Sequence, residues 1–497
     1  MQALKNLLTA IGVSEEQISD PEMLIEDIVY DSRKARNGVI FVCLVGAVAD
    51  GHRFAASAYE KGARVFVCEK PLALPEDALI YSVENTRRAL ASLSAAFFDH
   101  PEGKLRVIGV TGTKGKSTVC EMIRHILCEN GISAASIGTI GVRIGDVMTP
   151  TGNTTPESYE LFRIFADMVE KKVRYAIIEV SSQGVKMDRV FGIHFFAAVM
   201  TNLSEDHIGG AEHPDFEDYK RCKKELFARC DHAFFNKDDP YFEEFYESAS
   251  CPKQTYSITD EADFSAQSIL PTVTEKGFGS SFLLKYQNVR CDAFVPFPGS
   301  FSVSNALAAV AVSSLAGISL EKALDALSGV RVGGRFEIVP TVLSDVTFVI
   351  DYAHNGESMS AALKALRIYR PHRLICLFGS VGGRTEIRRK ELGVAAAAYA
   401  DFSILTSDNP DKEPALDIIS DIAEHMSDAE FIAVPDRKEA IAYAVSIAEP
   451  GDIVLLAGKG HETYQLIDGK KVPFSEREIL CEAAKEAVFA ERLQIGL

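Results

Sequence analysis

The sequence predicts an α/β protein with a small N-terminal α/β domain, a central doubly wound and mostly parallel sheet, and a C-terminal Rossmann-like domain. Short apolar runs rich in β-branched residues alternate with helical patterns along the chain, which is typical of parallel sheets. In the last two domains, glycines or polar residues follow each predicted parallel strand, as at the ligand-binding edge of such a sheet. The chain of 497 residues has room for about three domains.

The first predicted domain covers residues 1–103. Runs at 39–44 and 65–68 are apolar and are predicted to be strands, and the stretch 52–61 is predicted to be the helix between them. Polar or Gly-bearing turns, which include D-S-R and G-A-V-A-D-G, lie beside these strands. The turns alone indicate ordinary connections.

The central domain, residues 104–328, is predicted around a parallel sheet. A helix is predicted over 119–129, directly after the first strand, and an Ala-rich helix over 306–315. Short alternating runs between 264 and 297 predict an antiparallel edge. The predicted parallel strands are 107–110, 134–137, 175–179, 197–200 and 232–235.

The third domain, residues 329–497, again alternates strands with helices. Its strands end in the segments D-Y-A-H-N, G-S-V-G-G-R, S-D-N-P-D and G-K-G-H-E. Ligands of parallel sheets bind outside the carboxyl ends of the strands, so we expect a second binding edge here. The predicted strands are 346–350, 374–378, 402–406 and 453–457.

Composition argues against several classes of function. The net charge of −18 argues against a nucleic-acid partner, because phosphate backbones require a basic surface. No run approaches the roughly 20 apolar residues that span a bilayer, and the start of the chain lacks a signal-peptide layout. We therefore expect a cytoplasmic protein without membrane insertion. The ten cysteines include no C-x-x-C pair, so reduced and mostly buried thiols are expected.

Residues 106–118, R-V-I-G-V-T-G-T-K-G-K-S-T, predict a phosphate site. A Gly-rich turn between a strand and a helix binds phosphate because its backbone N–H groups approach the oxyanions and the helix N-terminus adds positive charge. Lys116 would reach the β- and γ-phosphates, and Ser117 would coordinate Mg²⁺. Val110 stands where the general P-loop pattern has its first glycine, so this motif alone leaves an ordinary Gly-rich turn as an alternative.

Metal ions that neutralise a γ-phosphate need further oxygen or imidazole ligands near the turn. Glu179 ends the strand predicted beside it, and His207 ends the run T-N-L-S-E-D-H after another strand. Both are candidate ligands because of this placement. Lys223 and Lys224 lie at the start of a predicted helical stretch, 222–227, where a solvated pair of charges is the simpler interpretation.

Together these motifs resemble the Mur ligases, the ATP-dependent enzymes that add amino acids to peptidoglycan precursors. The resemblance spans essentially the whole chain and rests on the ordered set G-T-K-G-K-S, E-V-S-S, T-N-L-S-E-D-H, N-K-D-D, F-S-V-S-N-A-L-A-A, G-G-R-F-E, D-Y-A-H-N and G-K-G-H-E. Within the family, the chain is most similar to the MurE type, the UDP-N-acetylmuramoyl-tripeptide synthetases. That similarity rests on D-S-R, G-N-T-T-P, S-D-N-P and G-K-G-H-E-T-Y-Q.

The resemblance implies a role for each matched residue. The catalytic residues would be Lys116, Glu179, His207 and Lys223. Two Mg²⁺ ions would be held by Ser117, Glu179, His207 and Lys223, the last as a carbamate (N6-carboxylysine). ATP would contact Gly112, Thr113, Lys114, Gly115, Lys116, Ser117, Thr118, Asn305, Arg335 and Asp351. The UDP-linked substrate would contact Tyr30, Ser32, Ala47, Val48, Ala49, Asn153, Thr154, Thr155, Ser181 and Arg189. The incoming amino acid would contact Arg389, Asp408, Asn409, Pro410, Asp411, Gly458 and Glu462.

The resemblance also implies a reaction in peptidoglycan synthesis. ATP would phosphorylate the γ-carboxylate of D-glutamate in UDP-N-acetylmuramoyl-L-alanyl-D-glutamate. The amine of a diamino acid would then attack the acyl phosphate and release phosphate. Lys116 and two Mg²⁺ would position the groups and neutralise charge, and the third domain would close to exclude water. The expected partners are these small molecules, and a monomer is expected.

One departure from the family pattern bears on the diamino acid. Asp411 stands where members that add meso-diaminopimelate have an arginine for the distal carboxylate. An aspartate there, with the variant D-Y-A-H-N-G-E-S, favours a lone ammonium group, so L-lysine is the expected substrate. The alternatives are meso-diaminopimelate, L-ornithine, a sister ligase of the folylpolyglutamate synthetase type, and a non-catalytic nucleotide-binding regulator.

Overall fold

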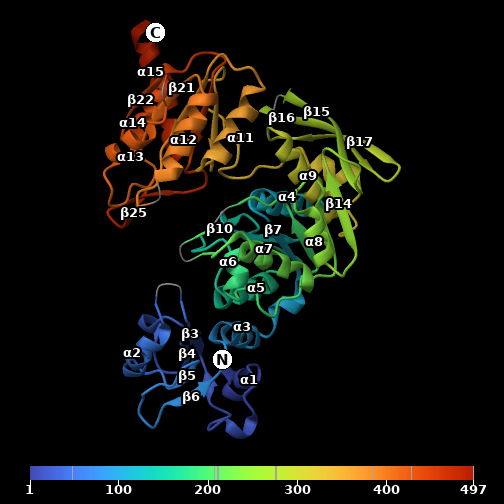
Figure 1. The fold of residues 1–497 in the computed structure, drawn as a ribbon, viewed down its shortest axis with the longest axis vertical. Coiled ribbons are helices and arrows are strands. Elements are labelled where there is room, and N and C mark those ends of the chain that lie inside the picture. The colour runs from blue at the N-terminus through green and yellow to red at the C-terminus, as the bar shows by residue number, and fades with distance from the viewer. Residues whose placement is uncertain are drawn as a thin grey trace. The chain divides into compact units, whose positions relative to one another are not determined.

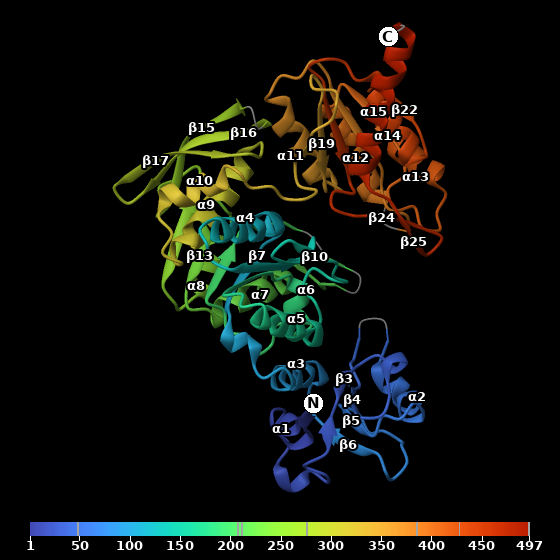
Figure 2. The same ribbon diagram turned by 180° about the vertical axis from the view of Figure 1, so that it is seen from behind.

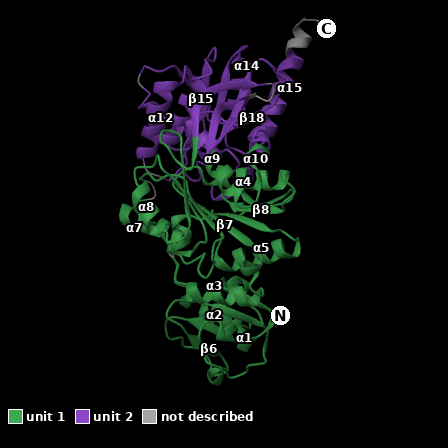
Figure 3. Cartoon of the chain, turned by 90° about the vertical axis from the view of Figure 1, so that its right-hand side faces the viewer, with its two compact units in different colours: residues 1–265, 307–323 green, residues 266–306, 324–497 purple. Residues whose placement is uncertain are grey.

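The computed structural model describes residues 1–46, 49–205, 208–209, 212–274, 277–383, 386–426 and 428–495. The chain divides into two compact units, shown in Figure 3. Unit 1 consists of residues 1–265 and 307–323, and unit 2 of residues 266–306 and 324–497. The three predicted domain boundaries stay predictions.

The N-terminal part of unit 1 is built on a four-stranded parallel sheet in the order β3-β4-β5-β6 (Figure 1). Ile40 and Phe41 on β4 pack into different cores, one on each face of the sheet. Continuous apolar runs are typical of parallel strands covered on both faces, which is why these strands could be predicted. The helix predicted over 52–61 is instead a 3₁₀ turn, Gly51–Phe54, followed by α2.

The elements of this part are β1 (Gln2–Ala3), α1 (Leu4–Thr9), β2 (Leu24–Ile25), β3 (Asp27–Val29), β4 (Val39–Val42), α2 (Ala55–Glu60), β5 (Val65–Cys68), β6 (Leu79–Ser82) and α3 (Thr86–Phe97).

The central sheet of unit 1 runs in the order β10-β9-β8-β11-β7-β12-β13-β14. Strands β8, β11, β7, β12, β13 and β14 are parallel, and β9 and β10 form an antiparallel edge that the sequence did not predict. Helix α4 packs on β7, β8 and β11, and Figure 2 shows it beside β7. Apolar residues of α5 and α7 join a common core with alternate residues of these strands. The prediction of a doubly wound sheet is confirmed.

The elements of this part are β7 (Arg106–Thr111), α4 (Lys116–Glu129), β8 (Ala134–Gly138), β9 (Gly141–Ile144), β10 (Val147–Thr149), α5 (Ser158–Glu170), β11 (Tyr175–Glu179), α6 (Ser182–Lys186), β12 (Ala197–Met200), α7 (Phe216–Lys224), β13 (Ala233–Asn236), α8 (Phe242–Ser248) and β14 (Lys253–Ser257).

The next segment holds β15 (Phe264–Thr274), β16 (Gly277–Tyr286), β17 (Val289–Val295), α9 (Ser300–Ser314) and α10 (Leu320–Leu327). β16 and β17 pair antiparallel, as predicted. Helix α9 begins six residues before the predicted start at 306. The polar residue Ser302 is accommodated near the start of this helix because its Oγ donates a hydrogen bond to the Pro298 backbone oxygen at 2.7 Å.

The main sheet of unit 2 runs in the order β18-β19-β23-β20-β21-β22, with β18 antiparallel and the others parallel. Helices α14 and α15 share a core with one face of this sheet. The elements are β18 (Glu337–Val339), β19 (Thr347–Asp351), α11 (Gly356–Arg367), β20 (Leu374–Phe378), α12 (Glu386–Tyr399), β21 (Phe402–Leu405), α13 (Ala415–Ala423), β22 (Phe431–Ala433), α14 (Arg437–Ile447), β23 (Ile453–Ala457), β24 (Tyr464–Ile467), β25 (Lys470–Pro473) and α15 (Glu476–Ile495).

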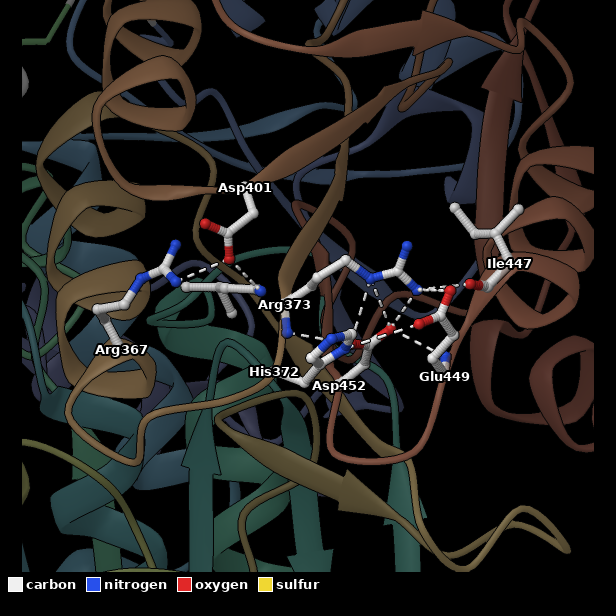
Figure 4. Close-up of polar contacts among 8 residues, drawn as sticks. Arg367, His372, Arg373, Asp401, Ile447, Glu449 and Asp452 are labelled. Atoms are coloured by element: carbon white, nitrogen blue, oxygen red, sulfur yellow. Dashed lines mark hydrogen bonds and ion pairs between the residues drawn. The ribbon is translucent and has the colours of Figure 1, made fainter.

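The amino ends of β20 and β23 carry a structural ion-pair network, drawn in Figure 4. The buried Asp452 carboxylate accepts from Arg373 at 2.6 Å and from the Glu449 backbone N–H at 2.9 Å. Because this network lies at the amino ends of the strands, the edge formed by their carboxyl ends stays available for ligands.

Each cysteine is a free thiol, as expected. In the described part of the chain, no helix has the length and apolar character needed to cross a membrane.

Candidate active site

The Gly-rich turn that is predicted to bind phosphate connects β7 to α4. Gly112 and Gly115 have positive φ angles of 143° and 83°, and Gly115 is the N-cap of α4. A Cβ atom on Gly112 would lie 1.9 Å from the Thr201 hydroxyl oxygen, so a larger residue does not fit. The turn presents backbone at a helix N-terminus, which suits an anionic phosphate.

The segment T-N-L-S after β12 holds this turn in place. Thr201 Oγ1 donates to the Lys114 oxygen at 2.6 Å, and Asn202 Oδ1 accepts from the Lys114 N–H at 2.9 Å. The Ser204 N–H donates to Thr113 Oγ1 at 3.0 Å. The sequence pointed to the histidine at the end of this run, whereas Thr201, Asn202 and Ser204 at its beginning fix the shape of the turn.

Two ammonium groups converge on the turn. Lys116 Nζ donates to the backbone oxygens of Gly112 and Thr113, each at 2.9 Å. Lys223 Nζ donates to the same Gly112 oxygen at 2.8 Å. Lys223 is only 1% exposed and lies near the end of α7, not at the start of a helix. Its interpretation as a solvated charge is therefore wrong.

Glu179 ends β11 next to β7, as predicted, and is 2% exposed. Its Oε1 accepts from the Thr139 N–H at 2.9 Å, and a Cβ atom on Gly138 would lie 2.0 Å from the same oxygen. Burial raises the pKa of Cys120 on α4, Glu179 raises it further and Lys116 lowers it. Glu179 and Lys116 thus act on the same buried thiol of α4 with opposite sign.

Several residues predicted to contact the UDP-linked substrate meet beside Glu179. Thr155 Oγ1 lies 3.0 Å from Ser181 Oγ and donates to the Glu179 backbone oxygen at 2.8 Å. Thr154 Oγ1 lies 2.9 Å from Thr139 Oγ1. Arg189 donates to the Thr155 backbone oxygen at 3.1 Å. The structure thus brings these four predicted residues together.

A chain of ion pairs connects this group with the N-terminal part of unit 1. Arg189 Nε donates to Glu157 Oε1 at 2.7 Å, and Arg87 donates to Glu157 Oε2 at 3.2 Å. Arg87 also donates to the backbone oxygen of Val45, directly before the G-A-V-A-D-G turn, at 3.1 Å. Arg87 and Glu157 were missed in the sequence, because only folding brings them to predicted site residues.

Tyr30 belongs to the same region. Its hydroxyl donates to both carboxylate oxygens of Glu160, at 2.9 and 2.8 Å. Burial and this carboxylate raise the pKa of Tyr30, so it stays a neutral hydrogen-bond donor at physiological pH.

Unit 2 brings together three motifs that the sequence placed far apart. Asp351 accepts from the N–H groups of Phe336 and Ala353, each at 2.8 Å. Burial raises the pKa of Asp351, and Arg335 opposes this shift. A Cβ atom on Gly334 would lie 2.1 Å from the backbone nitrogen of His461, so G-G-R-F-E packs tightly on G-K-G-H-E.

The loops after β21 and β23 form one polar cluster. Asn409 Nδ2 donates to Glu462 Oε2 at 2.9 Å. Asp408 is 3% exposed, and a Cβ atom on Gly458 would lie 3.0 Å from its Oδ2. The Lys459 ammonium lies among these side chains. Lys459 stands within the motif G-K-G-H-E, but no role was predicted for it from the sequence.

Asp411 and Arg389, two residues predicted to contact the incoming amino acid, form hydrogen bonds with other residues of unit 2. The Asp411 carboxylate accepts from the Gly469 N–H at 2.7 Å, at the turn of the β24–β25 hairpin. Arg389 donates to both oxygens of Glu413, at 2.7 and 2.6 Å, and to Asp421 at 2.6 Å. Asp411 thus has a local structural function.

The remaining predicted residues are more scattered. Ala49 and Asn153 are exposed, Ser32 begins a 3₁₀ turn, and Asn305 is buried on α9. Pro410 lies beside Gly382, whose N–H donates to the Asn409 oxygen at 2.9 Å. Ala47, Val48 and His207 lie outside the described residues.

Family models match three consecutive parts of the chain. They are described as "Mur ligase family, catalytic domain" for residues 24–98, "Mur ligase middle domain" for 110–313 and "Mur ligase, glutamate ligase domain" for 334–460. A UDP-N-acetylmuramoyl-L-alanyl-D-glutamate–2,6-diaminopimelate ligase of Clostridium acetobutylicum is 40% identical over 470 residues, covering 94% of this chain and 96% of that protein. The chain belongs to the Mur ligase family.

Other relatives agree with this assignment. The enzyme of the same name from Caldanaerobacter subterraneus subsp. tengcongensis is 39% identical over 479 residues, which cover 96% of this chain and 98% of that one. A solved structure of such a ligase superposes with a TM-score of 0.69 at 28% identity, covering 97% and 98% of the two chains. A Thermotoga maritima MurF ligase in complex with ADP shares the fold, with a TM-score of 0.63 at 19% identity and coverage of 95% and 99%.

These findings confirm the predicted fold class and the prediction that this Mur ligase is an enzyme of the amide-forming ligase class. They do not favour L-lysine, because the relatives are named for diaminopimelate. The residues at the phosphate turn themselves fit a divalent metal ion. Ser117 and Glu179 are hard oxygen donors of the kind that Mg²⁺ prefers, whereas Lys223 could join them only as a carbamate.

Proposed function

We propose that this Mur ligase joins a diamino acid to the D-glutamate of UDP-N-acetylmuramoyl-L-alanyl-D-glutamate, with ATP as phosphate donor, and that the diamino acid is diaminopimelate. The observation that carries the proposal is the β7–α4 turn with Lys116 and Lys223 both bonded to Gly112. The names of the relatives and the ADP of the related MurF ligase support it.

The proposed reaction has two steps. The D-glutamate γ-carboxylate attacks the γ-phosphorus of ATP, the bond to ADP breaks, and an acyl phosphate forms. The amine of the diamino acid then attacks the acyl carbon, loses a proton, and phosphate leaves. Phosphorylation supplies the leaving group that a carboxylate lacks.

The chain's own residues supply positioning and charge. Gly112–Thr118 bind the phosphates, and Lys116 neutralises charge on the transferred phosphoryl group. Thr154, Thr155, Ser181 and Arg189 lie together and bind the sugar and peptide end of the substrate. Asn305, Arg335 and Asp351 are the further ATP contacts that the family resemblance assigns.

Magnesium fits the oxygen donors that the chain offers for the phosphate site. Ser117, Glu179 and a carbamate on Lys223 would hold it, together with His207. Bound Mg²⁺ would neutralise the phosphate oxygens.

The choice of diaminopimelate replaces the expectation of L-lysine. That expectation depended on the Asp411 carboxylate facing an ammonium group of the substrate. The Asp411 carboxylate instead accepts from the Gly469 N–H at the turn of the β24–β25 hairpin. The Asp411 N–H also donates to the Leu466 oxygen of this hairpin, at 2.9 Å. The residue therefore carries little information about the substrate, and the relatives' names carry more.

Phosphate release tests the proposal directly. The purified protein is given ATP, Mg²⁺ and the UDP-linked dipeptide, with meso-diaminopimelate, L-lysine or L-ornithine offered separately. Fastest turnover with diaminopimelate supports the proposal. Preference for lysine or ornithine would keep the ligase and correct the amino acid, and no turnover with any of them would point to a sister ligase. A cytoplasmic monomer also remains part of the proposal, and light scattering tests the monomer.

A further inference from the structure

Lys459 is fully buried in unit 2, which is rare for a lysine unless its charge is paired. Its ammonium group faces three acceptors: Asp408 Oδ1 at 3.4 Å, Asn409 Oδ1 at 3.0 Å and Glu462 Oε2 at 2.9 Å. An ammonium group has three N–H donors, so the three acceptors match its capacity. All three acceptors belong to the predicted amino-acid contacts.

The contacts of Asn409 show why this arrangement is specific. Its Oδ1 accepts from Lys459 and from the Leu466 N–H at 2.9 Å, and its Nδ2 donates to Glu462 at 2.9 Å. The amide can satisfy these partners in one orientation only, since the oxygen must face the two donors. Lys459 thus links the loop after β21 to the loop after β23.

Charge adds a second effect. The cluster contains two carboxylates, Asp408 and Glu462, and one ammonium group. Its net charge is therefore one negative unit when all three are ionised, which suits one ammonium group of a ligand. Without Lys459, two carboxylates would share a buried site with no cation between them, at a large cost in free energy.

We propose that Lys459 is a positioning residue for the incoming diamino acid: it holds Asn409 and Glu462 in place and leaves this polar cluster one negative charge for a substrate ammonium group. The inference rests on the proposed function and deepens it, because it names the residue that organises the predicted amino-acid contacts.

Other hydrogen bonds hold the two loops around Lys459, so this residue can be substituted while the loops keep their backbone structure. Arg437 donates to the backbone oxygens of Ser407 at 3.0 Å and Ala457 at 2.7 Å, and it pairs with the buried Glu476. These bonds tie the ends of β21 and β23 together independently of Lys459. Substitution of Lys459 should therefore disturb side chains more than the backbone.

The test compares Lys459→Met with Lys471→Met. Methionine keeps most of the apolar stem and removes the charge. Lys471 is a matched control because its ammonium also lies near the Tyr464 ring, 4.1 Å from the ring centre against 5.8 Å for Lys459, but Lys471 is exposed. We expect the KM for the diamino acid to rise about 10-fold or more in Lys459→Met, since charged hydrogen bonds are lost. The KM values for ATP and the UDP-linked dipeptide should stay within about twofold.

The outcomes separate this inference from the proposed function. Unchanged KM values in Lys459→Met, or an equal rise for all three substrates, would overturn the positioning role. Wild-type rates test the proposed function, because they involve no substitution. If the wild type turns over none of the diamino acids, calorimetric titration with each of them decides the role of Lys459. Weaker binding to Lys459→Met than to wild type supports it, and equal binding or none overturns it.

Discussion

The Lys223 ammonium group donates to the Gly112 backbone oxygen at 2.8 Å, although 111 residues separate the two in sequence. This bond directs a buried lysine at the turn that is proposed to bind ATP. We expect Lys223→Gln to lower the rate of phosphate release by at least about 100-fold, because a group positioned at the transferred phosphate is lost.

Lys224 provides the control for this prediction. It is the next residue on α7, but it is partly exposed and pairs with Glu244 at 2.8 Å. Lys224→Gln should keep the wild-type rate within about twofold, since surface ion pairs contribute little. Equal rates of phosphate release in the two variants would show that Lys223 has no role at the phosphate site. Lower activity after CO₂ depletion would in addition support its carbamylation.

Gly138→Ala tests Glu179 through its neighbour. The new Cβ atom would lie 2.0 Å from Glu179 Oε1, so the carboxylate must move. We expect turnover to fall about 100-fold, as displacement of a site group by about 1 Å can cause. Gly103→Ala is the control, because a Cβ atom there would have open space for 4 Å around it among the described residues, and the φ of Gly103 is not positive. A Gly138→Ala enzyme with wild-type kcat and KM for ATP would show that Glu179 is not needed there.

Much of the fold could be predicted because buried parallel strands are apolar on both faces. The strands Val65–Cys68, Tyr175–Glu179, Ala197–Met200, Leu374–Phe378 and Ile453–Ala457 were predicted with the bounds that the structure has. The strand Lys253–Ser257, with the sequence K-Q-T-Y-S, was missed because its first residues are polar and only partly buried. Its backbone pairing with β13 makes this segment a strand, although its composition does not predict one.

The candidate site was predictable where a motif forms its own local structure. The turn at Gly112 is such a case, since two positive φ angles and a helix start follow from its glycines. Asp411 is the opposite case. Its partner, Gly469, lies 58 residues away, so no pattern in the loop could show that its carboxylate is already bonded.

Arg87 is expected to affect the UDP-linked substrate alone. It joins the Val45 oxygen to Glu157, which in turn holds Arg189. Arg87→Gln should raise the KM for the UDP-linked dipeptide about 10-fold, since charged hydrogen bonds are lost, with little change in the KM for ATP. The measurement is initial-rate kinetics with each substrate varied in turn.

The neighbouring residue on α3 separates this effect from general damage. Arg88 pairs with Asp188 at 3.2 Å, but 58% of its side chain is exposed. Arg88→Gln should leave every KM within about twofold of wild type. A matching rise in both variants would mean that the charge of α3, and not the Arg87 contact, is responsible.

The Glu413–Arg389 pair predicts a pH dependence of stability. Hydrogen bonds from Arg389, and then from the Gly383 N–H, lower the pKa of Glu413, and burial opposes them only in part. The ionised form therefore favours the folded state. Its contribution is fully present above the ordinary pKa near 4.5 and is lost as pH falls through the lower pKa of the folded protein. Removal of the charge by Glu413→Gln should cost about 1–3 kcal/mol at pH 7.

Urea unfolding of wild type and Glu413→Gln between pH 7 and pH 3 measures this contribution. The difference between their transition midpoints should be constant down to about pH 5 and then shrink, because wild-type Glu413 becomes protonated and resembles glutamine. Glu424→Gln, an exposed residue at the end of α13, should match wild type throughout. A difference that persists undiminished at pH 3 would mean that glutamine disturbs the packing around Arg389, and that the charge of Glu413 is not what stabilises this part of unit 2.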